Sequence, residues 1–214
     1  MLSTTFKAIS LLIVGCVAIT SNAARTFNIP PQFSGVGEIF QLNQDGTLSD
    51  TQGFTLMKAS TDLNLALNSL GQWKADATGA KVQSFTEQNF QDFAGGFGMD
   101  YKSSTQVCDQ YNIPSEQSVE EVISGLNNPY DDKSLTFLAQ KPALWDKSED
   151  FYIFNRGSGD NVSQQVYYSD KTGLLRYSVL YQTSTVFVFD LGEVFKVPES
   201  DLLPRDFMIK ECLQ

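Results

Sequence analysis

Asp100 and Asp190 are the side chains of this sequence with the strongest claim to catalytic chemistry, because each interrupts an otherwise apolar run. A carboxyl group inside an apolar strand has a raised pKa, which is the usual property of a general acid. Two such groups about 5–10 Å apart across a cleft would suit glycoside hydrolysis. More often, an acid at such a position marks a strand end or a solvent-facing side chain. We therefore assign no catalytic residue and leave open whether the protein is an enzyme.

The chain contains no histidine, which limits the catalytic and metal sites that it can form. This absence excludes Ser-His-Asp and Cys-His nucleophilic sites and every metal site with histidine ligands. Gly95-Gly-Phe-Gly98 lacks the Lys-Ser/Thr pair of a phosphate-binding loop. We expect no cofactor and no metal. The net charge of −10 repels phosphate backbones, so nucleic acid is not an expected partner.

Residues 1–23 have the layout of a secretory signal peptide. Lys7 precedes an apolar run, and Ser21-Asn-Ala23 offers small residues at the cleavage site. The run is too short to cross a bilayer and no later stretch is longer, so we predict a secreted, extracellular protein without an integral membrane span. The alternative is that Ile13-Val-Gly-Cys16 is a bacterial lipobox, in which case Cys16 would carry a lipid anchor.

Two cysteines, Cys108 and Cys212, remain after the signal peptide. In an oxidising compartment an even pair predicts one disulfide, which would tie the end of the chain to its middle. Asn161-Val-Ser163 is the only N-glycosylation sequon and lies in a polar loop. Asn161 is therefore the predicted site of a glycan in a eukaryotic host.

The elements that must position these residues are mostly strands. Residues 151–197 predict a meander, because runs of β-branched and aromatic residues alternate with turn-formers such as Ser169-Asp-Lys-Thr-Gly173. Strand side chains alternate with period 2, so one face of the strand at 174–181 is expected to carry every second residue. The residues predicted to share that face are Leu175, Tyr177, Val179 and Tyr181; on the next strand they are Phe187, Phe189 and Leu191.

Residues 24–32 are expected to form an extended leader, and residues 33–214 a single β-rich domain. Apolar spacing at 63–73 fits a strand, although a short helix over 61–70 is also compatible. The clearest helix is predicted from Ser115 to Ser124, opened by Pro114 and ended by Gly125. Further strands are expected at 33–42, 54–58, 81–88, 94–101, 105–111 and 207–209.

Some of these hairpins resemble those of a known group. The tip Asp76-Ala-Thr-Gly79 and the phrase Val166-Tyr-Tyr-Ser-Asp-Lys-Thr-Gly-Leu-Leu-Arg176 are similar to the sheet of the ependymins and bacterial lipoprotein carriers. The resemblance covers roughly residues 33–212. It implies a mainly β fold, in which a large antiparallel sheet curves into a half-barrel or open barrel and one or two short helices plug the opening. In that group the concave face holds a lipid or another hydrophobic ligand.

Large side chains on both faces of the C-terminal strands favour a secreted binding protein for a lipid or another apolar small molecule. The alternative is an extracellular structural or interaction protein, such as a matrix or surface component, with a filled core and a protein partner. An enclosed apolar cavity of several hundred Å³ would support the first, and a filled interior the second. The residues expected to line a ligand site are Trp73, Tyr177, Val179, Phe187 and Phe189.

Overall fold

The computed structural model describes residues 27–157 and 161–213. The predicted signal peptide, Cys16 and the first residues of the expected leader lie outside this range. Eleven strands form one antiparallel sheet in the order β6-β5-β4-β3-β2-β1-β11-β10-β9-β8-β7, so the prediction of a mainly β fold with one curved antiparallel sheet is confirmed. The strands are β1 (Gln32–Gln41), β2 (Gly53–Ser60), β3 (Leu65–Ala75), β4 (Lys81–Asp92), β5 (Phe97–Lys102), β6 (Val107–Asn112), β7 (Leu135–Lys141), β8 (Phe151–Arg156), β9 (Gln164–Ser169), β10 (Leu175–Tyr181) and β11 (Val186–Asp190).

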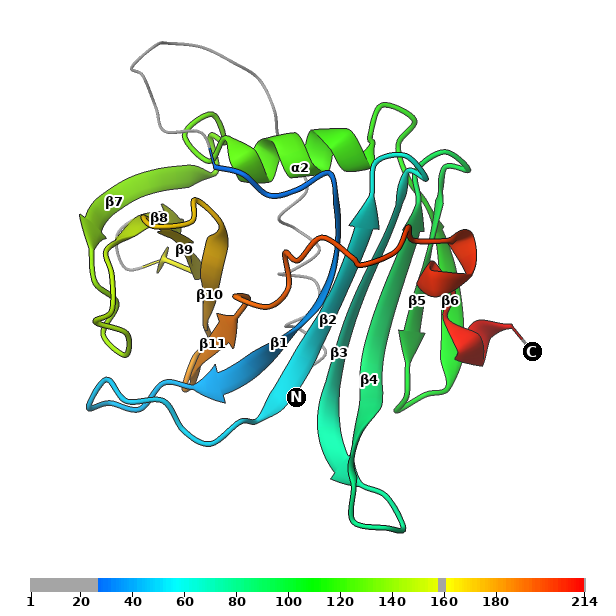
Figure 1. Ribbon diagram of the computed structural model, residues 1–214, viewed down its shortest axis with the longest axis horizontal. Coiled ribbons are helices and arrows are strands. Elements are labelled where there is room, and N and C mark those ends of the chain that lie inside the picture. The colour runs from blue at the N-terminus through cyan, green and yellow to red at the C-terminus, as the bar shows by residue number, and fades with distance from the viewer. Residues whose placement is uncertain (1–26, 158–160, 214) are drawn as a thin grey trace.

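The sheet consists of two meanders that meet at its centre. Strands β1–β6 follow one another along the chain, as do β7–β11, and β1 pairs with both β2 and β11. At this central seam Ile39 lies opposite Phe189. The chain must therefore travel from edge strand β6 to the opposite edge strand β7. Helix α2 (Val119–Asn127) lies on this connection and crosses the open side of the curved sheet (Figure 1).

Helix α2 begins and ends later than the predicted span from Ser115 to Ser124. Its N-cap is Ser118, whose Oγ accepts a hydrogen bond from the backbone N–H of Glu121 at 3.1 Å. Such a cap satisfies one of the N–H groups that the first turn leaves unpaired. Gly125 lies within the helix instead of ending it. The predicted start is wrong because Ser118 caps the helix, and the next N–H, that of Val119, is held by Asn64, which is distant in the sequence.

Apolar side chains cover both faces of the sheet. Val119, Ile123 and Leu126 of α2 pack on the concave face with residues such as Phe33 and Phe189. The outer face has two separate clusters. One lies over β3 and β5 and contains Phe207 and Ile209 of the C-terminal segment; the other lies over β8–β11 and contains Ala143, Trp145, Phe151, Tyr177 and Val179.

One predicted face is divided by a bulge. The pairing of β10 with β9 shifts register between Leu175 and Tyr177. An extra residue in one strand turns the following side chains to the other face. Leu175 accordingly packs beneath α2, whereas Tyr177 and Val179 lie in the outer cluster. The prediction that these three share one face is wrong for Leu175.

The segment whose apolar spacing fitted either a strand or a short helix forms β3, so the helical alternative over 61–70 is wrong. The edge strand predicted at 207–209 is also wrong, because this segment forms two 3-10 helices, η3 (Pro204–Phe207) and η4 (Lys210–Cys212). The carboxylate of Asp206 accepts a hydrogen bond from the N–H of Leu203 at 2.8 Å and closes the first of these turns. Phe207 is fully buried, so the segment is held by packing on the outer face.

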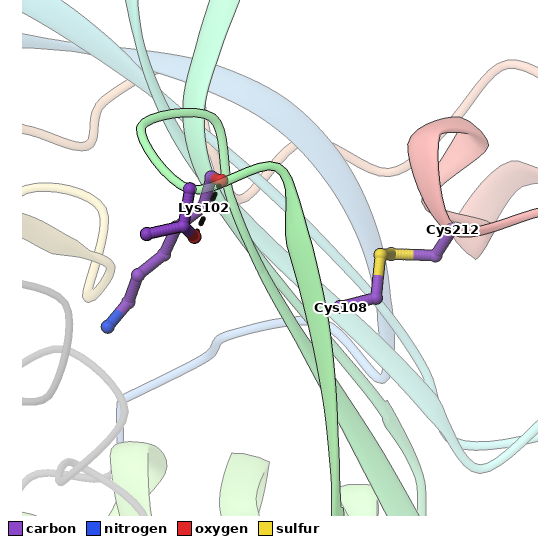
Figure 2. Close-up of a disulfide and its surroundings, with 4 residues drawn as sticks. Lys102, Cys108 and Cys212 are labelled. Atoms are coloured by element: carbon purple, nitrogen blue, oxygen red, sulfur yellow. Dashed lines mark hydrogen bonds between the residues drawn. A yellow bond between two sulfur atoms is a disulfide. The ribbon is translucent and has the colours of Figure 1, made fainter.

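Cys108 and Cys212 form the predicted disulfide (Figure 2). Their Cα atoms lie 5.8 Å apart, and 104 positions separate them in the sequence. The bond joins edge strand β6 to η4. Lys102 extends on the opposite side of the β5–β6 ribbon from the two sulfur atoms (Figure 2), so the disulfide belongs to the outer face and Lys102 to the concave face.

Replacing both cysteines in the double variant Cys108→Ser/Cys212→Ser should lower the free energy of unfolding by about 2–5 kcal/mol, because the unfolded chain regains the freedom of a long loop. Urea denaturation followed by tryptophan fluorescence measures this loss. A reductant should destabilise the native protein by a similar amount and leave the double variant unchanged. Equal denaturation midpoints for the native protein and the double variant would contradict a stabilising bond.

Candidate functional site

A cavity of about 60 Å³ lies between α2 and the concave face of the sheet. Its walls are mainly apolar and include Val122 and Ile123 of α2, Met57 of β2, Ala66 of β3 and Phe189 of β11. This volume exceeds the roughly 10–15 Å³ that one water requires. It is smaller than the roughly 300 Å³ at which ordinary ligand pockets begin. The space is therefore a slot that admits a whole ligand only if α2 moves away from the sheet.

One end of this cavity is polar. Asn68 of β3 and Gln91 of β4 are among its lining residues, and each is only 8% exposed. Asn68 lies opposite Asn89, and Ala66 lies opposite Gln91. Because side chains on a strand alternate between faces, Glu87, Asn89 and Gln91 share the concave face. We call these three residues of β4 the acceptor row.

Each residue of the acceptor row has a buried oxygen with no hydrogen-bond partner within the described part of the chain. These atoms are Oε2 of Glu87, Oδ1 of Asn89 and Oε1 of Gln91. The three side chains are 7%, 3% and 8% exposed, in the same order. Buried polar groups in native proteins are nearly always paired, and leaving one unpaired costs about 1–3 kcal/mol. The row therefore offers three acceptors for which the described residues supply no donor.

The orientation of the Asn89 amide follows from its donors. Its Nδ2 donates to Oδ1 of Asp100 at 2.5 Å and to the hydroxyl oxygen of Tyr111 at 2.6 Å. Both hydrogen bonds donated by Nδ2 are to residues of β5 and β6, so Oδ1 of Asn89 takes no part in this hydrogen-bond network. Asp100 in turn lies opposite Asp109 of β6. The edge of the concave face next to the acceptor row is thus acidic.

Burial raises the pKa of the Glu87 carboxyl, because the ionised form loses contact with water; the positive charge of Lys102 opposes this shift and the negative charge of Asp100 adds to it. Burial likewise raises the pKa of the Tyr111 hydroxyl. Lys102 lies directly opposite Glu87 on β5. The site therefore holds a carboxylate whose ionisation is costly in the folded protein.

Helix α2 is fastened at both ends. At its start, the carboxamide oxygen of Asn64 accepts from the N–H of Val119 at 2.9 Å. At its end, the side chain of Asn127 exchanges two hydrogen bonds with the backbone of Ile29, at 2.6 and 3.1 Å. The hydroxyl of Tyr168 donates to a carbonyl of the last turn at 2.9 Å. The cavity extends along the helix, since Val119, Val122, Ile123 and Leu126 all line it.

The structure places the five predicted lining residues in three different environments. Phe189 lines the cavity, and Phe187 packs against the same core. Tyr177 and Val179 belong to the outer cluster that also contains Ala143. Trp73 contacts Phe54 with the rings tilted by 45° and their centroids 4.9 Å apart, on the outer face of β2 and β3. The structure therefore brings only the two phenylalanines to the concave side.

Asp100 and Asp190 are not brought together. Asp190 forms an ion pair with Arg176 at 2.9 Å, whereas Asp100 accepts from Asn89. The strands β5 and β11 that carry them are separated by four others. Strand spacing alone puts the two carboxylates about 24 Å apart along the sheet. This pair does not form the cleft that glycoside hydrolysis requires.

Asn161 is exposed, as the attachment site of a glycan must be.

The sequence analysis did not identify the acceptor row, because polar residues in an alternating strand normally indicate a solvent-facing side. The predicted strand also ends at Gln88. In the structure β4 continues to Asp92, so Asn89 and Gln91 reach the covered part of the sheet. The burial of these two amides is a signal only once the position of α2 is known.

The sequence matches no model of a known protein family and no curated protein. In the described ranges, no helix has the length and apolar character needed to cross a membrane. The same ranges contain no group of three or more cysteine, aspartate and glutamate side chains placed to hold a metal ion. The resemblance to ependymins and lipoprotein carriers stays a prediction.

Replacing Glu87 by Gln should make the protein progressively more stable than the native form as pH rises from about 4.3 toward the raised folded-state pKa of Glu87. The folded-state pKa of Glu87 is raised, so above the unfolded-state value of about 4.3 the unfolded chain releases this proton more readily than the folded one. The native protein loses stability over that interval, and the variant does not. Urea midpoints at several pH values measure the difference.

The exposed Glu199 offers a matched control, since Glu199→Gln removes the same charge outside the site. We expect its stability relative to the native protein to change little with pH. A Glu87→Gln difference that stays constant across the interval would contradict the raised pKa.

Proposed function

We propose that the protein binds an apolar or amphipathic small molecule, such as a lipid, between α2 and the concave face of the sheet. The observation that carries this proposal is the apolar cavity beneath the middle of α2, which ends at the acceptor row. The apolar walls suit an alkyl chain, and the oxygens of the row suit a polar head with hydrogen-bond donors. An amphipathic ligand would account for both features.

The size of the cavity determines how such a ligand enters. A cavity of about 60 Å³ is too small for an alkyl chain, so α2 must move away from the sheet to admit one. Each methylene group that enters contributes about 0.8 kcal/mol, and each large side chain of α2 that leaves its contacts costs about 1.5–3 kcal/mol. A chain of about eight carbons therefore compensates for the displacement of two or three side chains. Binding of a medium or long chain is energetically reasonable.

The alternative is an extracellular structural or interaction protein with a filled core. Two observations favour it: the small volume of the cavity and the exposed apolar side chains near edge strand β7. Phe137, Leu138 and Leu144 are 44%, 48% and 67% exposed. An unpaired strand edge with apolar side chains is suited to pairing with another protein. In this alternative the edge, not the cavity, is the functional surface.

We further propose that the protein acts outside the cell. The disulfide and the exposed Asn161 support this location, because both features are typical of secreted proteins. An anchor at Cys16 remains the alternative for a bacterial source. In either case the expected ligand is a lipid or another apolar small molecule, and an extracellular protein is the partner in the second hypothesis.

Isothermal titration with n-alkanols of eight to fourteen carbons tests the binding proposal with ligands that have no charged head group. We expect saturable binding of one molecule per chain, with affinity increasing roughly fourfold per added methylene until the space is filled. Ala66→Leu, which places three more carbons in the cavity wall, should weaken binding at least about tenfold. Ala75→Leu is the matched control, because Ala75 lies on the same strand but is exposed.

The absence of saturable binding for every chain length would reject the carrier proposal and favour a filled core. Equal weakening by Ala66→Leu and Ala75→Leu would show that the alkanols bind somewhere other than under α2.

A further inference from the structure

The acceptor row begins inside the cavity and continues beyond it. Gln91 is a lining residue, and Asn89 and Glu87 follow on the same face at intervals of two residues. Two strand residues span about 6.8 Å, so the row extends roughly 14 Å from Gln91 to Glu87. A polar head attached to a chain in the cavity would lie directly against these oxygens.

The unpaired atoms of the row are all acceptors. A carboxylate or a fully ionised phosphate has no donor to offer them, and an alcohol has one. An ammonium group has three donors and no acceptor of its own. Hydrogen bonds between an ammonium and a carboxylate or amide oxygen are charge-assisted and about twice as strong as neutral ones.

The charges near the row favour a cation. Asp100 and Lys102 of β5 directly oppose Asn89 and Glu87, and Asp109 of β6 lies opposite Asp100. Together with Glu87, these residues give three carboxylates against one ammonium. Tyr111 also faces the row and accepts from Asn89. Lys102 does not form a hydrogen bond with Oε2 of Glu87, since this oxygen has no partner among the described residues.

We propose that the ligand is an amphipath with a protonated amine head, whose alkyl chain lies under α2 and passes Gln91, and whose ammonium lies between Asn89 and Glu87. This inference rests on the proposed binding function and adds the chemical class of the head. An amine with a neighbouring hydroxyl would satisfy more of the row than a simple amine.

Three compounds with the same twelve-carbon chain test the inference: dodecylammonium, dodecanol and dodecanoate. Dodecylammonium and dodecanoate are titrated below their critical micelle concentrations and dodecanol below its solubility limit, at pH 7 and physiological salt. We expect dodecylammonium to bind about tenfold or more tightly than dodecanol, and dodecanoate to bind most weakly. Glu87→Gln should weaken dodecylammonium about tenfold and change dodecanol by less than about twofold.

Two controls separate this site from general attraction between a cationic amphipath and a protein with net charge −10. Glu199→Gln removes one exposed negative charge and should leave all three affinities unchanged. Ala66→Leu should weaken dodecylammonium and dodecanol alike, and each should displace the other at one site.

The possible results distinguish the proposed binding function from the proposed amine head. If none of the three compounds binds, the binding function itself fails. Equal affinities for the three heads, or tightest binding of dodecanoate, would overturn the amine assignment while leaving a carrier for apolar chains. Equal effects of Glu87→Gln and Glu199→Gln, or failure of the amine and the alcohol to compete, would also overturn it.

Discussion

The path of the chain from one edge of the sheet to the other is the constraint on which the structure depends. Pairing of β1 with β11 joins two meanders into a single sheet, and the last strand of the first meander and the first strand of the second then lie at opposite edges. The connecting segment must cross a face. Its helix carries Val119, Ile123 and Leu126 toward the sheet, so the crossing also covers the apolar part of the concave surface. The cavity results from laying a straight helix over a curved sheet.

The concave face is not uniform, and this asymmetry gives the site its character. Strands of the C-terminal meander contribute apolar residues such as Phe154, Val166 and Phe189, whereas β4 contributes Glu87, Asn89 and Gln91. Unpaired buried acceptors reduce the stability of the folded state. Proteins depart from good packing and pairing mainly where function requires it. The cavity lies where apolar walls meet Gln91, the first residue of the acceptor row, and this is where an amphipathic molecule would lie.

The sequence predicted the regular part of this fold because local chemistry decides it. Hairpin tips ending at Gly79 and Gly173 have φ values of +84° and +72°, the left-handed conformation that glycine adopts without strain. The two cysteines left after the signal peptide allowed only one bond. The bulge at Leu175 and the burial of Asn89 and Gln91 could not be predicted, since both depend on which distant segments cover the sheet. The same is true of the C-terminal 3-10 helices, whose burial is decided by the outer face of β3 and β5.

A crystal structure of the protein with 12-bromododecanol tests the central claim most directly, because the anomalous signal of bromine locates the end of the chain. The account predicts one bromine between α2 and the concave face, near Phe189 and Ile123, with α2 moved away from the sheet. Bromine bound only at the outer face or at edge strand β7, with α2 and its cavity unchanged, would contradict it.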